Sequence, residues 1–293
     1  MKVKRVKLDE LHSVLTSNVN CEHLIIPKDT EKFSREKIFS EELAVIFDWD
    51  DTLTKPGINN NSWQIANNAF SKTGERKDIL LLDKMSKKYH EIEKQRPLTR
   101  KEMKEWQRLN MQMYVDYELN LNCLEKEIQK SRIYLSGAIL ILYLLENYSK
   151  VCIISSGIKN IIDSTLNYYG INSKEYGNLQ INATELIFNN KGIITGWEDN
   201  SIVTAEKKPW LVHGFARIWD IPHENIFVVG DGNTDLNMLD LVSKEATMIF
   251  FCPSHKKESL TKERFNLISS KAHGFVKENF SVITNFFIET IEA

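Results

Sequence analysis

Two aspartates separated by a single residue follow a short apolar segment of the chain. The segment LAVIF, residues 43–47, leads directly into Asp48, and Asp50 and Thr52 come soon after it. Carboxylates this close repel each other, and a bound Mg²⁺ would relieve the repulsion with the oxygen ligands that it prefers. Asp48 is placed to attack a phosphorus atom, and Asp50 to act as general acid and later as general base. A solvated acidic turn is the alternative interpretation.

A second pair of aspartates follows another apolar segment far along the chain. Asp231 comes after IFVV, residues 226–229, and has Gly230 and Gly232 on either side, while Asp235 lies four positions later. The two glycines permit a tight turn at the end of the predicted strand. The segment is therefore a candidate for a functional turn at the end of a strand, and its alternative is an acidic turn without a metal.

A third segment offers groups that bind anions. In IISSGIKN, residues 153–160, Ser155 ends a predicted strand and small residues lead into a predicted helix. Backbone N–H groups at such a helix N-terminus attract phosphate, and Ser156 and Gly157 would contribute theirs. An ordinary helix cap is the alternative. Lys207 and Lys208 form a pair that usually marks a solvated surface, but here it precedes the helix that leads to the strand before Asp231.

The elements that must position these residues alternate along the chain. Continuous apolar segments of this length are typical of strands in a parallel sheet that is buried on both faces. Such strands are predicted at residues 43–47, 151–154, 226–229 and 247–251, and helices at 137–146 and 209–219. The alternation predicts a doubly wound α/β fold, in which ligands bind beyond the carboxyl ends of the strands. Asp48, Ser155 and Asp231 are all expected there.

Residues 56–132 have a different character, being charged and helical. Helices are predicted at 78–93, from the capping box at Thr99 and Glu102 to residue 119, and at 123–129. We interpret this block as a helical cap inserted into a catalytic core of residues 1–55 and 133–293. An independent helical bundle is the alternative. Residues 182–198 are expected to form a hairpin around Gly192.

In their order along the chain, these segments resemble the motifs of haloacid dehalogenase (HAD) superfamily phosphatases. The resemblance implies a Rossmann-like core with a parallel sheet and an inserted C1 cap. It also implies that Asp48 attacks phosphorus and binds Mg²⁺, that Asp50 adds its backbone carbonyl as a ligand, and that Asp231 is a direct ligand. Thr52 and Asp235 would support the ligands.

The same resemblance implies which groups hold the phosphate. Ser155 aligns with the phosphate-binding Ser or Thr of the superfamily, with Ser156 and Gly157 beside it. The lysine of the third motif is often followed directly by proline. Lys208 fits that spacing better, and Lys207 remains an alternative.

Two segments of the predicted cap resemble cytosolic pyrimidine 5′-nucleotidases. They are YHEIE, residues 89–93, and MKEW, residues 103–106. By this resemblance Glu93 would accept hydrogen bonds from a base, with Trp106 and Asn110 nearby, and the substrate would be a nucleoside monophosphate. Asp51 departs from many relatives, which carry glycine or an apolar residue there. The alternatives are another small phosphomonoester, such as phosphoserine or a sugar phosphate, and a binding module without activity.

The composition is typical of a globular protein of 293 residues, with 42% hydrophobic and 27% charged residues. The formal net charge of −2 predicts neither a nucleic acid polymer nor an anionic membrane as partner. No apolar run approaches the roughly 20 residues of a membrane span, and we expect a cytoplasmic protein. Cys152 and Cys252 lie in apolar segments and are expected to be buried thiols. The oligomeric state is left open.

Overall fold

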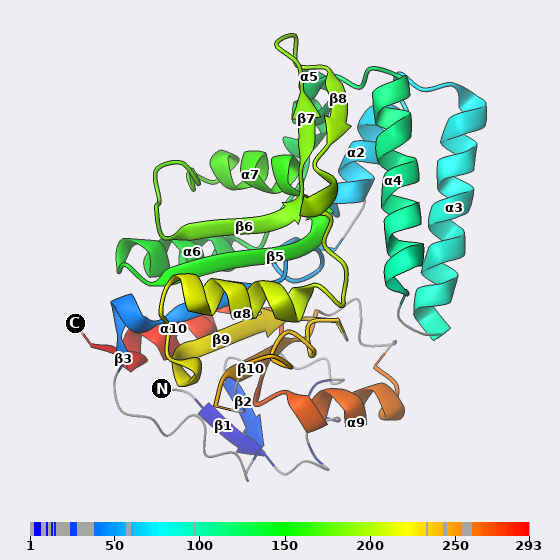
Figure 1. Ribbon diagram of the computed structural model, residues 1–293. Coiled ribbons are helices and arrows are strands. Elements are labelled where there is room, and N and C mark those ends of the chain that lie inside the picture. Colours follow the sequence, from blue (N-terminus) through cyan, green and yellow to red (C-terminus); the bar gives the residue numbers. More distant parts are fainter. Residues whose placement is uncertain are drawn as a thin grey trace.

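The computed structural model describes residues 3–6, 10, 13, 15, 24–27, 38–56, 60–95, 98–232, 234–242, 245–253 and 260–292. Within these ranges the strands build a central sheet of eight, in the order β1-β2-β11-β10-β9-β4-β5-β6 (Figure 1). Their bounds are β1 Val3–Val6, β2 Leu24–Pro27, β4 Ala44–Phe47, β5 Lys150–Ile158, β6 Leu179–Thr184, β9 Ile226–Gly230, β10 Thr247–Phe251 and β11 Gly274–Val276. Neighbouring strands are parallel except β2 and β11.

Helices cover both faces of the sheet, because successive residues of a strand point to opposite sides. Val45 and Phe47 of β4 pack into one apolar cluster, with α6 (Leu135–Glu146), α7 (Lys159–Tyr168) and α10 (Phe280–Thr290). Ala44 and Ile46 pack into the other, with α8 (Lys208–Ile218) and α9 (Lys262–Lys271). The predicted doubly wound α/β fold is therefore confirmed.

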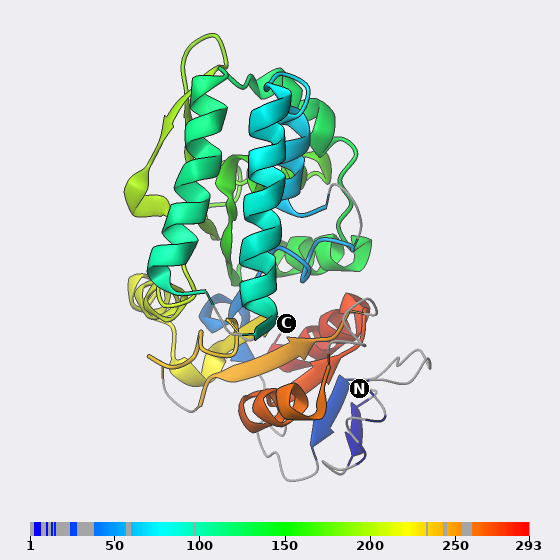
Figure 2. The same cartoon turned by 90° about the vertical axis from the view of Figure 1, so that its right-hand side faces the viewer.

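Four helices lie between β4 and α6 in the chain: α2 (Ser62–Phe70), α3 (Arg76–Gln95), α4 (Arg100–Asp116) and α5 (Leu121–Ile128). Helices α3 and α4 lie side by side in both views (Figures 1 and 2). Together with the antiparallel hairpin of β7 (Leu186–Phe188) and β8 (Ile194–Trp197), these four helices form a third apolar cluster, which also includes Ile158 of β5 and Ile161 of α7. The predicted capping box at Thr99 and Glu102 is present. The division of the chain at residues 56 and 132 stays a prediction.

Strand β5 is longer than the sequence predicted. Strand β5 continues four residues beyond Ile154 and pairs with β6 again at Ile158, after a register shift. Ser155, Ser156 and Gly157 therefore lie in the end of a strand, and not in the expected turn at a helix N-terminus, since α7 begins only at Lys159.

The remaining described elements are short and lie around the sheet. A pair of parallel strands joins β3 (Ile38–Phe39) to β12 (Ile291–Glu292). Three 3₁₀ turns cover Ser40–Glu42, Asp199–Ser201 and His223–Asn225.

Helix α2 was not predicted from the sequence, although Asn61 caps it by accepting a hydrogen bond from the backbone N–H of Trp63. None of the described helices combines the length and the apolar character that a bilayer crossing requires.

Candidate active site

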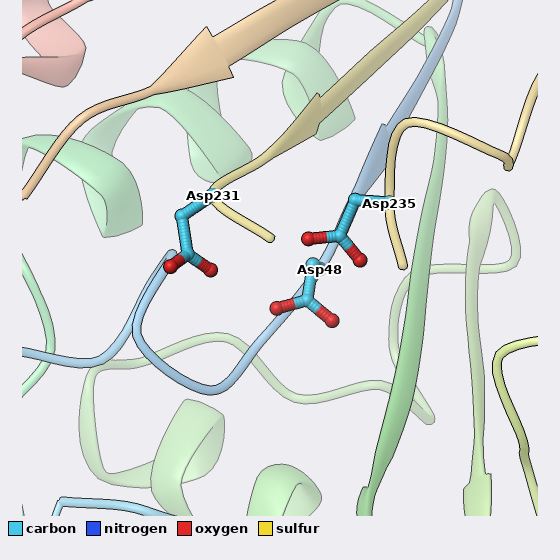
Figure 3. A group of neighbouring side chains, drawn as sticks. All are labelled: Asp48, Asp231 and Asp235. Carbon is cyan, nitrogen blue, oxygen red and sulfur yellow. The ribbon is translucent and has the colours of Figure 1, made fainter. Parts of the chain in front are cut away.

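Three buried carboxylates meet at the carboxyl ends of β4 and β9. Asp48 follows β4 directly, and its backbone N–H donates to the carbonyl of Val229 in β9 at 2.9 Å. One oxygen from each of Asp48, Asp231 and Asp235 lies within 4.8 Å of the others (Figure 3). The hydroxyl of Thr52 contacts Asp48 at 3.3 Å and Asp231 at 3.0 Å. Asp48 of the first segment and Asp231 and Asp235 of the last are thus brought together.

The two lysines that the sequence left as alternatives occupy different places. Lys208 is buried, and its Nζ lies 2.7 Å from Asp48 Oδ1 and 2.7 Å from Asp235 Oδ1. Lys207 points away from the cluster and donates to the backbone carbonyls of Asn200 and Ile202. Lys208 is therefore the lysine whose charge reaches the carboxylates, in agreement with the proline spacing.

Burial governs the electrostatics of the cluster. Burial, reinforced by the Asp235 carboxylate, raises the pKa of Asp48, and Lys208 opposes that rise. Burial would lower the pKa of Lys208, but the carboxylates of Asp235 and Asp48 raise it above its ordinary value. If all groups are ionised, three carboxylates and one ammonium leave a net charge of −2. A divalent cation bound by oxygen ligands would neutralise that charge, so the residues present fit such an ion.

Asp50 lies outside this cluster and is held by the first residue of α2. Its carboxylate accepts the backbone N–H of Ser62 at 2.9 Å and the Ser62 hydroxyl at 3.0 Å. Burial raises the pKa of Asp50 to about 6, and the two hydrogen bonds from Ser62 limit the rise. A carboxyl group with this pKa exchanges its proton near neutral pH, which is the property that a general acid requires.

The segment Ser155–Gly157 approaches Asp50 very closely. The backbone N–H of Gly157 donates to Ser155 Oγ at 3.0 Å. A Cβ atom at Gly157 would lie 2.2 Å from Ser62 Oγ and 2.8 Å from Asp50 Oδ2. Only glycine fits this position without displacing those groups.

Side chains from outside the sheet hold the carbonyl oxygen of Ser156. It accepts from Trp63 Nε1 at 3.0 Å and from Gln107 Nε2 at 2.9 Å. Ser62, Trp63 and Gln107 were all missed from the sequence. The only local sign was Asn61, whose residue type marks a helix start just before Ser62.

A pocket of about 510 Å³ opens over these groups. The sheet side contributes Asp48, Asp50, Ser155, Ser156, Lys208, Asp231 and Asp235, and the helices contribute Trp63, Tyr89, Met103 and Trp106 among others. The ring centroid of Trp106 lies 5.0 Å from that of Trp63 and 6.4 Å from that of Tyr89. Among the described lining residues the cations are Lys87 and Lys208.

The three predicted base-binding residues, Glu93, Trp106 and Asn110, differ in what the structure describes of them. Trp106 lines the pocket as expected. Asn110 is buried one turn further along α4, where it donates to the Trp106 carbonyl at 2.8 Å, and it is not among the described lining residues. Glu93 belongs to α3, but its side chain lies outside the part of the chain that the structure describes.

Comparison with solved structures gives the fold. Cytosolic 5′-nucleotidase IIIB bound to cytidine matches with a TM-score of 0.70 and 15% identity, covering 98% of this chain and 99% of that chain. A substrate-bound phosphoserine phosphatase matches with a TM-score of 0.57 and 18% identity, covering 88% and 99%. At these identities the likeness concerns the fold, which is that of the HAD phosphatases.

Comparison with protein families gives the particular family. The pattern described as Pyrimidine 5′-nucleotidase (UMPH-1) matches residues 52–268. The chain therefore belongs to the pyrimidine 5′-nucleotidase family and is a phosphatase, as the resemblance implied. No curated protein sequence matches the chain.

Proposed function

We propose that this phosphatase hydrolyses pyrimidine nucleoside 5′-monophosphates through a phosphorylated Asp48 and that it depends on Mg²⁺. The observation that carries the proposal is the buried contact of Lys208 with Asp48 and Asp235 at the floor of the pocket. This contact holds the Asp48 carboxylate in position to attack, beside the Lys208 ammonium that can neutralise a phosphoryl group.

The proposed mechanism uses the chain's own groups in turn. Asp48 attacks phosphorus and forms an aspartyl-phosphate, while Asp50 gives its proton to the departing 5′-oxygen. Asp50 then takes a proton from the water that releases phosphate. Ser155 and the backbone N–H of Ser156, with Lys208, hold the phosphoryl oxygens throughout, so that positioning and electrostatics supply most of the rate. The Gly157 N–H, which the sequence also predicted to bind phosphate, donates to Ser155 Oγ instead.

Asp48, Asp231 and the backbone carbonyl of Asp50 are the groups that would hold Mg²⁺. The excess negative charge of the buried cluster supports this proposal. When bound, the ion supplies positive charge that neutralises phosphoryl oxygens. Thr52 would hold Asp48 and Asp231 through its hydroxyl, and Asp235 would act through Lys208, which also contacts Asp48.

The substrate assignment rests on the family and on the helical side of the pocket. We propose that residues 56–132 act as a cap that selects the leaving group. Trp63, Tyr89 and Trp106 offer aromatic faces, which suit stacking against a base. Arginines that would favour a carboxylate-bearing substrate such as phosphoserine are not among the described lining residues. We retain Glu93 as the proposed acceptor for a base amine.

The test is phosphate release from a panel of CMP, UMP, purine monophosphates, phosphoserine and sugar phosphates, with Mg²⁺ and after chelation. Wild type is compared with Asp48→Asn, which keeps the size of the side chain and removes the nucleophile. We expect release led by CMP or UMP that chelation and the substitution both abolish. Release led by another ester would discard the substrate assignment, and an active Asp48→Asn would discard the mechanism.

A further inference from the structure

Gln107 is an amide with no exposed surface, although it belongs to α4 and not to the sheet. Its Nε2 donates to the Ser156 carbonyl at 2.9 Å and approaches the Val203 carbonyl at 3.5 Å. Its Oε1 accepts from the hydroxyl of Thr184 at 3.4 Å. One side chain of the helical region therefore joins the end of β5, the end of β6 and the segment that precedes Lys207.

These partners fix the direction of the amide. Backbone carbonyls can only accept, so the NH₂ group of Gln107 must face Ser156 and Val203. Rotating the amide by half a turn would place its oxygen against two other oxygens in a buried site, which is costly. Gln107 is thus a donor that points in one direction.

The hydrogen bond from Gln107 also orients groups at the end of β5, where Ser155 is the proposed phosphate ligand. Because a peptide group is planar, holding the Ser156 carbonyl also orients the N–H of Gly157. That N–H donates to Ser155 Oγ at 3.0 Å, so the oxygen acts as an acceptor there. Within the described part of the chain the Ser155 hydroxyl has no acceptor of its own, and Ser155 lines the pocket. Its hydrogen is left to be donated to a ligand oxygen.

We propose that Gln107 is a positioning residue for phosphate binding, acting through the Ser156 carbonyl and the Gly157 N–H to direct the hydroxyl of Ser155. The inference rests on the proposed function, because it takes Ser155 as a phosphate ligand. Trp63 donates to the same carbonyl and is the second member of this arrangement.

The experiment measures inhibition of CMP hydrolysis by inorganic phosphate, which reports on the phosphate site without contacts to a base. Gln107→Met keeps the length of the side chain and removes its donor. Gln112→Met is the matched control on the same helix, where the exposed Gln112 contacts only Asp116 among its described partners. We expect Gln107→Met to weaken phosphate inhibition about tenfold, since a buried donor to the carbonyl is lost, and the control to leave it unchanged.

A double-mutant cycle separates positioning from general loosening of the fold. If Gln107 acts through Ser155, then Gln107→Met should add almost nothing to Ser155→Ala. Equal losses in both backgrounds would overturn the inference. Trp63→Phe repeats the cycle on the same carbonyl, should Gln107→Met fail to fold.

The single variants also distinguish this inference from the proposed function. If Ser155→Ala leaves phosphate inhibition unchanged, the phosphate-binding role proposed for Ser155 fails, and the relay fails with it. If Ser155→Ala weakens inhibition and both Gln107→Met and Trp63→Phe do not, only the positioning role is refuted.

Discussion

Adding one methyl group at Gly157 should disable the enzyme. The new Cβ would lie 2.2 Å from Ser62 Oγ, well inside contact distance, and 2.8 Å from Asp50 Oδ2. Ser62 would have to leave, and its hydroxyl would lose the contacts with Asp50 at 3.0 Å and with the Ile158 N–H at 3.2 Å.

The magnitude follows from those contacts. Two hydrogen bonds contribute about 1 kcal/mol each, and overpacking costs a further 1–3 kcal/mol or so. We therefore expect Gly157→Ala to lower the free energy of unfolding by about 3–5 kcal/mol. Because the displaced groups hold Asp50, kcat should fall at least about 100-fold.

Gly214 provides the matched control. It lies inside α8, and apart from its chain neighbours and the backbone of its own helix, a Cβ atom there would meet no described atom within 4 Å. Gly214→Ala should raise the free energy of unfolding by about 0.5–1 kcal/mol, because alanine favours helix, and leave kcat unchanged. Urea unfolding and steady-state phosphate release are measured on both variants. A Gly157→Ala protein with the urea midpoint and kcat of wild type would refute the close packing described here.

Three further predictions concern charge and protonation. Lys208→Met should lower kcat about 10²–10³-fold in steady-state assays, whereas Lys207→Met should change it little, because only Lys208 reaches the buried carboxylates. Ser62→Ala removes a hydrogen bond to the charged form of Asp50, so the pKa of Asp50 should rise above about 6. The alkaline limb of the kcat–pH profile should then move to higher pH, and a shift to lower pH would contradict this role. Burial raises the pKa of Cys152 to about 12, so peptide mapping after alkylation near neutral pH should find Cys152 unmodified until the protein is unfolded.

The sheet and the positions of the residues at its strand ends were predictable because the central strands are continuous apolar segments followed by polar residues. This pattern is local, so it correctly placed Asp48 and Asp231 at the carboxyl ends of two neighbouring central strands. The doubly wound fold and the family followed from the same segments. The roles of the individual site residues stay predictions.

What the sequence did not reveal depends on contacts between distant segments. Thr184 and Gln107 are 77 positions apart, and no local sequence pattern at either residue indicates that the two side chains are in contact. Strand β5 was predicted too short because its last residues are small and polar and lack an apolar pattern. The choice between Lys207 and Lys208 needed the start of α8, which turns the second lysine toward the carboxylates.

The most direct test of the central claim is to trap the phosphorylated enzyme. Wild type is mixed with CMP and Mg²⁺, quenched in acid during turnover, reduced with borohydride and digested for mass spectrometry. Reduction converts an aspartyl-phosphate to homoserine, so we predict homoserine in place of Asp48 and in no other position. Turnover of CMP with Asp48 always recovered as unmodified aspartate, or with the label on another residue, would contradict the account.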